Sequence, residues 1–176
     1  MKKLMLLTGV CFLTIGFSPI NSNPMANRLV KQLVADVPHN EKAFSELIAM
    51  GRTAVPALIN GMASYDEMIR TQCMRALVRI GTPAERPLMD ALKNRPEWRV
   101  RAWSALALGE MKSNVAVDTL IDSLRYDNHW WVQCESALAL GKIGNERAIP
   151  VLETISQDGD ERVNYRARFA LEKLRE

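Results

Sequence analysis

The fold of this chain is decided by VQCESALALGKIG, the stretch from Val132 to Gly144, because the chain repeats it. A close copy begins one repeat earlier at Val100, and a looser one begins a further repeat back at Ile69. Another copy follows at Val163, one repeat after Val132. A recurrence of about thirty residues is typical of stacked repeats, in which each unit buries its apolar face against the next. The repeat therefore predicts a stacked array.

Each unit of the array is predicted to be a pair of helices. In the second helix of the third unit, Val100, Ser104, Leu108 and Met111 have the spacing of one helical face. Glycine ends two of the second helices, as a helix C-terminus favours. Alanines at matched positions of the second helices should let neighbouring helices approach closely. The glycines are Gly81 and Gly144, and the alanines are Ala76, Ala107, Ala139 and Ala170.

Proline marks the first helix of most units. Pro56, Pro87 and Pro150 occupy matched positions, and Asp118 takes that place in the remaining unit. A proline near the start of a helix loses little hydrogen bonding. The pattern predicts an all-α solenoid of about five helix pairs, in which the two end units are atypical and act as caps. In the first unit we expect a turn at 37–40. The predicted units are 24–51, 52–81, 82–112, 113–144 and 145–176.

The first residues have the pattern of an export signal. Lys2 and Lys3 precede the apolar run Leu4–Phe17, which is shorter than the roughly 20 apolar residues that a bilayer-spanning helix needs. We therefore expect a signal peptide at 1–22, with its cleavage site open, and the repeat array at 24–176. This predicts an exported protein, periplasmic or secreted. A lipoprotein at Cys11 and an uncleaved envelope anchor are the alternatives.

Charge and cysteine content exclude some classes of partner and of covalent framework. The net charge is +3, and it falls to near zero once Lys2 and Lys3 are removed. Such a balance gives no broad attractive field for a polyanion, so we expect no nucleic-acid partner. We expect membrane contact only through a retained signal segment. Cys73 and Cys134 lie in units that are not neighbours, so no disulfide is expected between them.

The units resemble HEAT repeats of the short type that is named after the phycobilisome lyases. In that pattern a first helix with proline and an acidic turn precede V-R-x-x-A-x-x-A-L-G-x-I-G. Val132–Gly144 matches it closely, with Gln133 in place of the arginine that Arg70 and Arg101 supply in earlier units. The resemblance covers about 27–175 and implies a fold rather than a ligand. The turn acids are Asp66, Glu97 and Asp160, but His129 in the fourth unit.

Two groups of enzyme-associated proteins resemble this array. The deoxyhypusine hydroxylases place His-Glu pairs at repeat positions to hold two irons, whereas here Asn40 follows His39 and Trp130 follows His129. The phycobilin lyase subunits share the repeat, but no residue here points to a bilin. The sequence also lacks a nucleophile elbow, a phosphate loop and a metalloprotease motif. We predict a non-catalytic scaffold without cofactor or metal; a metal-dependent hydroxylase-like or lyase-like enzyme is the alternative.

The candidate binding residues are mostly aromatic. All four tryptophans lie in the third and fourth units, at positions that are mostly polar in the other units. Tryptophan and tyrosine are favoured at interfaces because they bury a large area with few torsions to freeze. We predict a patch that contacts an unidentified protein or peptide partner, with membership of an envelope complex as one option; the alternative is that the rings pack over gaps between units. The candidates are Trp98, Trp103, Tyr126, His129, Trp130 and Trp131.

Charged residues form two further patterns. Asp66 with Arg70, and Glu97 with Arg101, stand one helical turn apart and suit an ion pair at a helix start or a ladder between units.

Arginines also gather on the second and third units, where they could touch phosphate or an acidic partner. Interspersed glutamates favour a solvated helix face instead. These arginines are Arg70, Arg75, Arg79, Arg99 and Arg101.

Overall fold

The computed structural model describes residues 23–33, 37–158 and 160–176, with the backbone alone at 37–39. This part of the chain holds ten α-helices, three single-turn 3-10 helices and no strand. The predicted all-α repeat fold is therefore confirmed. The predicted signal segment, 1–22, lies outside the described residues. Among the described helices, none combines the length and apolar character needed to cross a membrane.

The helices alternate between a first and a second helix of each pair. The first helices are α1 (Pro24–Gln32), α3 (Val55–Gly61), α5 (Thr82–Asn94), α7 (Val117–Tyr126) and α9 (Ile149–Gln157). The second helices are α2 (Val37–Ala49), α4 (Glu67–Ile80), α6 (Trp98–Glu110), α8 (Trp130–Ile143) and α10 (Glu161–Arg175). The 3-10 helices Gly51–Thr53, Asn114–Ala116 and Glu146–Ala148 lead into α3, α7 and α9.

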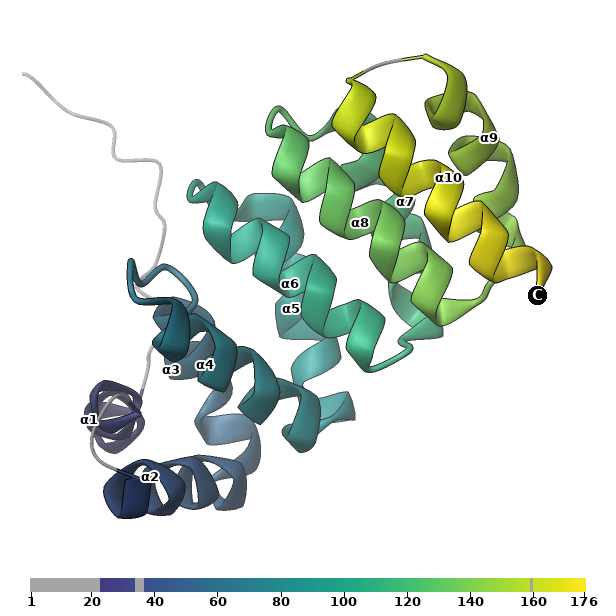
Figure 1. Ribbon diagram of the computed structural model, residues 1–176. Coiled ribbons are helices and arrows are strands. Elements are labelled where there is room, and N and C mark those ends of the chain that lie inside the picture. The colour runs from purple at the N-terminus through teal and green to yellow at the C-terminus, as the bar shows by residue number, and fades with distance from the viewer. Residues whose placement is uncertain (1–22, 34–36, 159) are drawn as a thin grey trace, which may run out of the picture.

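The pairs stack into two layers over most of the chain. In Figure 1, α6, α8 and α10 lie side by side with α5 and α7 behind them, and α9 packs against α10 at the edge of the stack. Leucines from both layers have no exposed surface, among them Leu88, Leu108, Leu120 and Leu140. The apolar faces of α6 and α8 therefore point at the first helices. The opposite faces of α6 and α8 carry side chains that are exposed or half-buried.

Glycine and proline set the helix ends much as their chemistry predicts. Gly81 and Gly144 end α4 and α8 with φ of 76° and 78°, the left-handed region that glycine enters without strain. Pro56 and Pro150 lie in the first turns of α3 and α9. Pro87 instead lies inside α5, because that helix already begins at Thr82.

The predicted turn at 37–40 is wrong. The helix α2 begins at Val37, so 37–40 form its first turn. Proline is well tolerated there because the first amides of a helix have no partner within the helix. Pro38 therefore marks a helix start rather than a turn.

Glycine also lets three second helices approach closely. A Cβ on Gly109 would lie 2.7 Å from the Cα of Ala139, and one on Gly141 would lie 2.9 Å from the Cα of Ala170. The equivalent position of α4 is Val78, and α4 contacts α6 less extensively than α6 contacts α8. The array is therefore tight from α6 to α10 and looser between α4 and α6.

Candidate functional site

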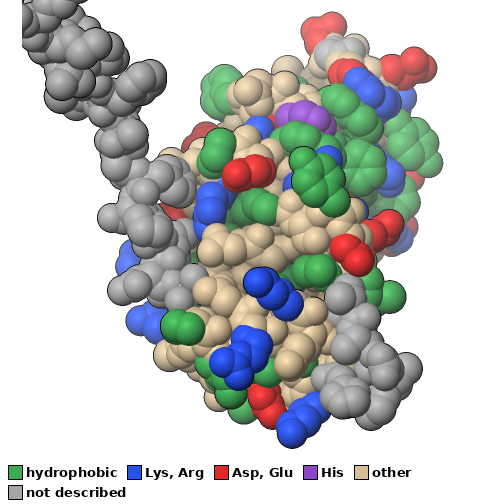
Figure 2. Space-filling view, turned by 90° about the vertical axis from the view of Figure 1, so that its left-hand side faces the viewer, with side chains coloured by type: hydrophobic (Ala, Val, Ile, Leu, Met, Phe, Trp, Pro, Cys, Tyr) green, Lys and Arg blue, Asp and Glu red, His purple; other side chains and the backbone are tan. Residues whose placement is uncertain are grey.

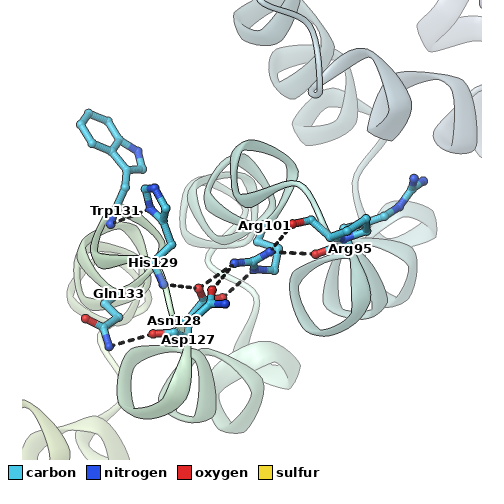
Figure 3. A network of polar contacts seen from close by, with 8 residues as sticks. Arg95, Arg101, Asp127, Asn128, His129, Trp131 and Gln133 are labelled. Carbon is cyan, nitrogen blue, oxygen red and sulfur yellow. Dashed lines mark hydrogen bonds and ion pairs between the residues drawn. The ribbon is translucent and has the colours of Figure 1, made fainter.

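A buried arginine fixes the loops on which the candidate residues stand (Figure 3). Arg101 of α6 donates from Nε and Nη2 to the two carboxylate oxygens of Asp127, at 2.7 and 2.9 Å, and from Nη2 to Asn128 Oδ1 at 2.9 Å. Its Nη1 donates to the carbonyls of Arg95 and Pro96, both at 2.9 Å. One guanidinium thus joins the α5–α6 loop to the α7–α8 loop.

The ion pairs predicted within the helix starts are not those that form. Arg101 pairs with Asp127 rather than with Glu97, and Arg70 donates to the carbonyls of Ser64 and Tyr65 rather than to Asp66. Asp66 instead caps α4 by accepting from two backbone amides. A capping carboxylate faces its own helix end, so it is turned away from the arginine one turn later.

His129 is held at the start of α8 by the same network. Its backbone amide donates to Asp127 Oδ1 at 2.9 Å, and its Nδ1 accepts from the Trp131 amide at 3.2 Å. Burial lowers the pKa of His129 from its ordinary 6.5, while the Asp127 carboxylate opposes that shift. An imidazole that accepts at Nδ1 must be neutral, so the cap and the lowered pKa agree.

Aromatic side chains form a row along the N-terminal ends of four second helices, with an arginine near each end of the row. The rings of Trp98 and His129 stack with centroids 4.2 Å apart, and Trp130 continues the stack 6.0 Å from His129. The Arg162 guanidinium lies 3.7 Å from the Trp130 centroid. Arg99 closes the other end, over Trp98 and Tyr65. We call these six residues the aromatic row. Figure 2 shows a histidine among hydrophobic side chains, with lysine or arginine side chains close by.

A groove opens between α8 and α10 beside this row. It has a volume of about 380 Å³ and is lined by Trp130, Trp131, Cys134, Glu135, Glu161, Arg162, Tyr165 and Arg166. Trp131 meets Trp130 edge-on at 5.3 Å and remains 41% exposed. Tyr165, on the opposite wall, is 61% exposed. The groove therefore offers two large rings to a ligand.

Two residues that line the groove, Glu135 and Cys134, have shifted pKa values. Burial raises the pKa of Glu135, and the positive charges of Arg166 and Lys142 oppose the shift. Burial likewise raises the pKa of the Cys134 thiol to about 11. A thiol with such a pKa is protonated at neutral pH and is a poor nucleophile. Cys134 therefore serves as a small apolar wall rather than as a reactive group.

The structure brings together four of the six candidate residues. Trp98, His129 and Trp130 form the stack, and Trp131 borders it. Trp103 lies farther along α6, with Arg70 at 5.7 Å from its ring. Tyr126 belongs elsewhere: it lines a separate open hollow of about 740 Å³ that Arg101 and Asp127 also line.

Sequence reasoning missed the α10 wall of the groove. Arg162, Tyr165 and Arg166 follow Trp131, Cys134 and Glu135 at the spacing of one repeat. Equivalent positions of adjacent stacked helices lie side by side, so this spacing was the signal that could have found them.

Comparison with known proteins places the chain. Residues 85–172, half of the chain, match the family model for HEAT repeats. The chain belongs to the HEAT-repeat family. No curated protein sequence matches it. The resemblance to repeats of the phycobilisome-lyase type is confirmed, because a phycocyanin lyase is among the similar structures.

Three solved structures share the fold of this HEAT-repeat chain. A chain from the complex of CpcE and CpcF of phycocyanin lyase from Nostoc sp. PCC7120 is 20% identical, with a TM-score of 0.59 over 83% of this chain and 97% of that one. Human deoxyhypusine hydroxylase is 21% identical, with a TM-score of 0.57 over 87% of this chain and 63% of the hydroxylase. An engineered protein is 20% identical, with a TM-score of 0.50 over 85% of this chain and 79% of the engineered one. Identities this low establish the fold alone.

Proposed function

We propose that this HEAT-repeat chain is a non-catalytic scaffold that binds a protein or a peptide at the groove between α8 and α10. The observation that carries the proposal is the pair of exposed rings, Trp131 and Tyr165, on facing walls of that groove. Arg162 and Arg166 flank them. Tryptophan, tyrosine and arginine are the residues most enriched among those that dominate binding energy at interfaces.

The surroundings of the two rings support this proposal. Arg101, Asp127 and the stacked aromatic row fix the start of α8, so Trp131 is presented by a rigid support. A rigid anchor loses less conformational entropy on binding than a mobile one. The similar lyase structure is itself a complex of CpcE and CpcF, which is consistent with a protein partner.

The site of action proposed for the scaffold is outside the cytoplasm. The proposal rests on the pattern of residues 1–22, with Lys2 and Lys3 before Leu4–Phe17. N-terminal sequencing of the protein recovered from its own cells tests it. A mature terminus near residue 23 is expected, and a protein that keeps Met1 in the cytoplasm would contradict export.

Partner capture from the envelope fraction tests the binding proposal. The baits would be the mature chain, a Trp131→Ala/Tyr165→Ala variant, and Tyr126→Ala as the control. Tyr126 is 76% exposed but lines the other cavity. We expect a protein that the mature chain and the control retain and that the double variant loses while its circular dichroism stays helical. Equal retention by all three baits would contradict the proposed site.

A metal-dependent enzyme of the hydroxylase or lyase type is the alternative. Fold similarity to deoxyhypusine hydroxylase and phycocyanin lyase motivates it. In the described part of the chain, no three His, Cys, Asp or Glu side chains gather as a metal site. Metal analysis of purified protein separates the two functions. Near-stoichiometric iron that resists mild chelation would contradict the scaffold.

A further inference from the structure

We infer that the partner presents an acidic segment with an apolar middle, which lies across the open face of α4, α6, α8 and α10. This inference rests on the proposed function and adds the chemistry of the ligand. On each helix the outward positions follow an i, i+4, i+7, i+11 spacing from Met68, Arg99, Trp131 or Arg162. None of these positions is buried. We call this surface the outer face.

The outer face carries more basic than acidic side chains, and most of its cations already have partners. Lys142 pairs with Glu110, Arg162 with Asp160 and Lys173 with Glu176. Arg99 lies over the rings of Trp98 and Tyr65. These side chains contribute little net attraction for an anion because their charge is balanced locally or their face is covered.

Four arginines of the outer face form no ion pair with a carboxylate among the described residues: Arg75, Arg79, Arg99 and Arg166. Two rings cover Arg99, whereas Arg75 and Arg166 each lie over one ring, at 5.6 and 6.0 Å from its centroid. Arg75 and Arg79 of α4 line a hollow of about 210 Å³ together with Phe44 and Glu110, and the Glu110 carboxylate is paired with Lys142. Arg166 lines the α8–α10 groove at the opposite end of the face. The face therefore offers cations at both ends.

Apolar side chains occupy the middle of the outer face. Leu106 of α6 and Leu138 of α8 are equivalent positions on adjacent helices, both half-buried. Phe169 continues the line on α10 and is 42% exposed. A segment that crosses the helices along this line would bury its own apolar side chains there. Its terminal acids would reach the arginines at the two ends.

Two glutamates on the face favour a peptide over a nucleic acid. Glu110 lies in the hollow with Arg75 and Arg79, and Glu135 lies in the groove with Arg166. A nucleic acid carries a charge at every nucleotide and would bring phosphates against both glutamates. A peptide, in contrast, can carry acidic residues only at the positions that face arginines. It can also supply the aliphatic side chains that the leucines favour.

The width of the face sets the length of the segment. Neighbouring packed helices lie roughly 8–10 Å apart, so the three steps from α4 to α10 span roughly 25–30 Å. An extended chain covers about 3.3–3.6 Å per residue. The segment that reaches from Arg79 to Arg166 therefore has on the order of eight residues.

Selection from a random-sequence peptide display library on the immobilised full chain tests the chemistry of the ligand. Fluorescence anisotropy of the best binder would then compare the chain with two variants, Arg75→Gln/Arg79→Gln and Arg166→Gln. Arg147→Gln serves as the control, because Arg147 lies away from the outer face in an exposed pair with Asp118. Trp131→Ala/Tyr165→Ala reports whether the peptide uses the proposed site.

We expect selected peptides rich in Asp, Glu, Leu and Phe, bound more weakly at high salt. Each arginine substitution should weaken them by up to about fivefold, and Arg147→Gln should not. Selection of neutral or basic peptides whose binding depends on Trp131 and Tyr165 would overturn the inference that the ligand is acidic. The proposed scaffold function would still hold. The absence of any binder sensitive to Trp131→Ala/Tyr165→Ala would overturn both proposals. Tighter binding of a single-stranded oligonucleotide than of any selected peptide would overturn the choice of a peptide.

Discussion

At the scale of the residue, the site depends on Arg101. Its side chain is 10% exposed and that of Asp127 is 7% exposed, so this ion pair is shielded from water. The guanidinium also holds two backbone carbonyls and Asn128. Removing one partner of a buried pair leaves the other charge without compensation. Arg101 therefore stabilises both the stack and the presentation of Trp131.

We expect Arg101→Leu to lower the free energy of unfolding by about 3–5 kcal/mol, because it leaves the Asp127 carboxylate buried and unpaired. Urea denaturation followed by circular dichroism measures the change. Arg147→Leu is the control: its pair with Asp118 is 64% and 70% exposed, so its loss should change stability by less than about 1 kcal/mol. Similar losses in the two variants would show that burial does not set the strength of the Arg101 pair.

We also expect His129 to make the fold less stable in mild acid. Its pKa in the folded chain is below the ordinary 6.5, so the unfolded chain binds this proton more readily. The contribution of neutral His129 to the free energy of unfolding is fully present above pH 6.5. It is lost as the pH falls from there through the pKa of His129 in the folded chain. Urea denaturation from about pH 7.5 to about pH 5 should reveal this loss. His129→Asn keeps a capping side chain without a titratable ring, so it should lose less stability between these pH values than the unsubstituted chain. Identical dependence of stability on pH in the two chains would contradict the assignment of this loss to His129.

Two serines test whether buried hydroxyls weaken the core. The Ser104 and Ser136 hydroxyls are buried without a hydrogen-bond partner in the described structure, and Ala167 takes the equivalent position in α10. An unsatisfied buried polar group costs about 1–3 kcal/mol. We therefore expect Ser136→Ala to leave stability unchanged or raise it by up to about 1 kcal/mol in urea denaturation. A clear loss of stability would indicate a hydroxyl interaction that the structure does not contain.

At the scale of the element, glycine spacing controls how the second helices pack. The same periodicity that predicts the helices also marks Gly109 and Gly141, which face alanines of the next helix. Close packing of this kind is sensitive to a single methyl group. The α4 helix, with Val78 at the equivalent position, packs less extensively on α6.

We expect Gly109→Ala and Gly141→Ala each to destabilise the fold by about 1–3 kcal/mol, because the new Cβ would meet the backbone of the facing helix. The control is Glu172→Ala, which lies one repeat after Gly141 on the exposed side of α10. It should change stability by less than about 0.5 kcal/mol. If the glycine variants match this control in thermal and urea unfolding, the helices do not depend on close approach.

The helices could be predicted from sequence because their apolar spacing repeats and glycine marks two ends. The stack of Trp98, His129 and Trp130 could also have been predicted from the sequence, because these residues occupy matched or adjacent positions of neighbouring repeats. The pairing of Arg101 with Asp127 was not, because it joins two irregular loops whose geometry no periodicity encodes. Arg162 and Tyr165 were missed because residue spacing places them beside α8 but does not show that a groove opens there and exposes them.

At the scale of the whole molecule, the array divides into a tight and a loose part. The helices α6, α8 and α10 are joined by glycine–alanine contacts, whereas α4, with Val78 at the equivalent position, contacts α6 less extensively. In a stack each unit is stabilised by its neighbours alone, so a weak junction limits cooperativity. The proposed binding groove lies in the tight part, which suits a preorganised site.

We expect amides of α4 to exchange through opening events of lower free energy than amides of α6 and α8. The reason is the less extensive contact of α4 with the rest of the stack. Native-state hydrogen exchange, read by NMR in rising denaturant, measures these free energies. Uniform values across α4, α6 and α8 would contradict a division at the α4–α6 junction.

The claim that the outer face of the second helices binds the partner is tested most directly by NMR chemical-shift mapping. The isotope-labelled mature chain would be titrated with the captured partner or a selected peptide. We expect the largest changes at the Trp131 indole and at the amides around Leu138 and Arg166, with α5, α7 and α9 little changed. Changes centred on α5, α7 and α9, with the Trp131 indole unmoved, would contradict the claim.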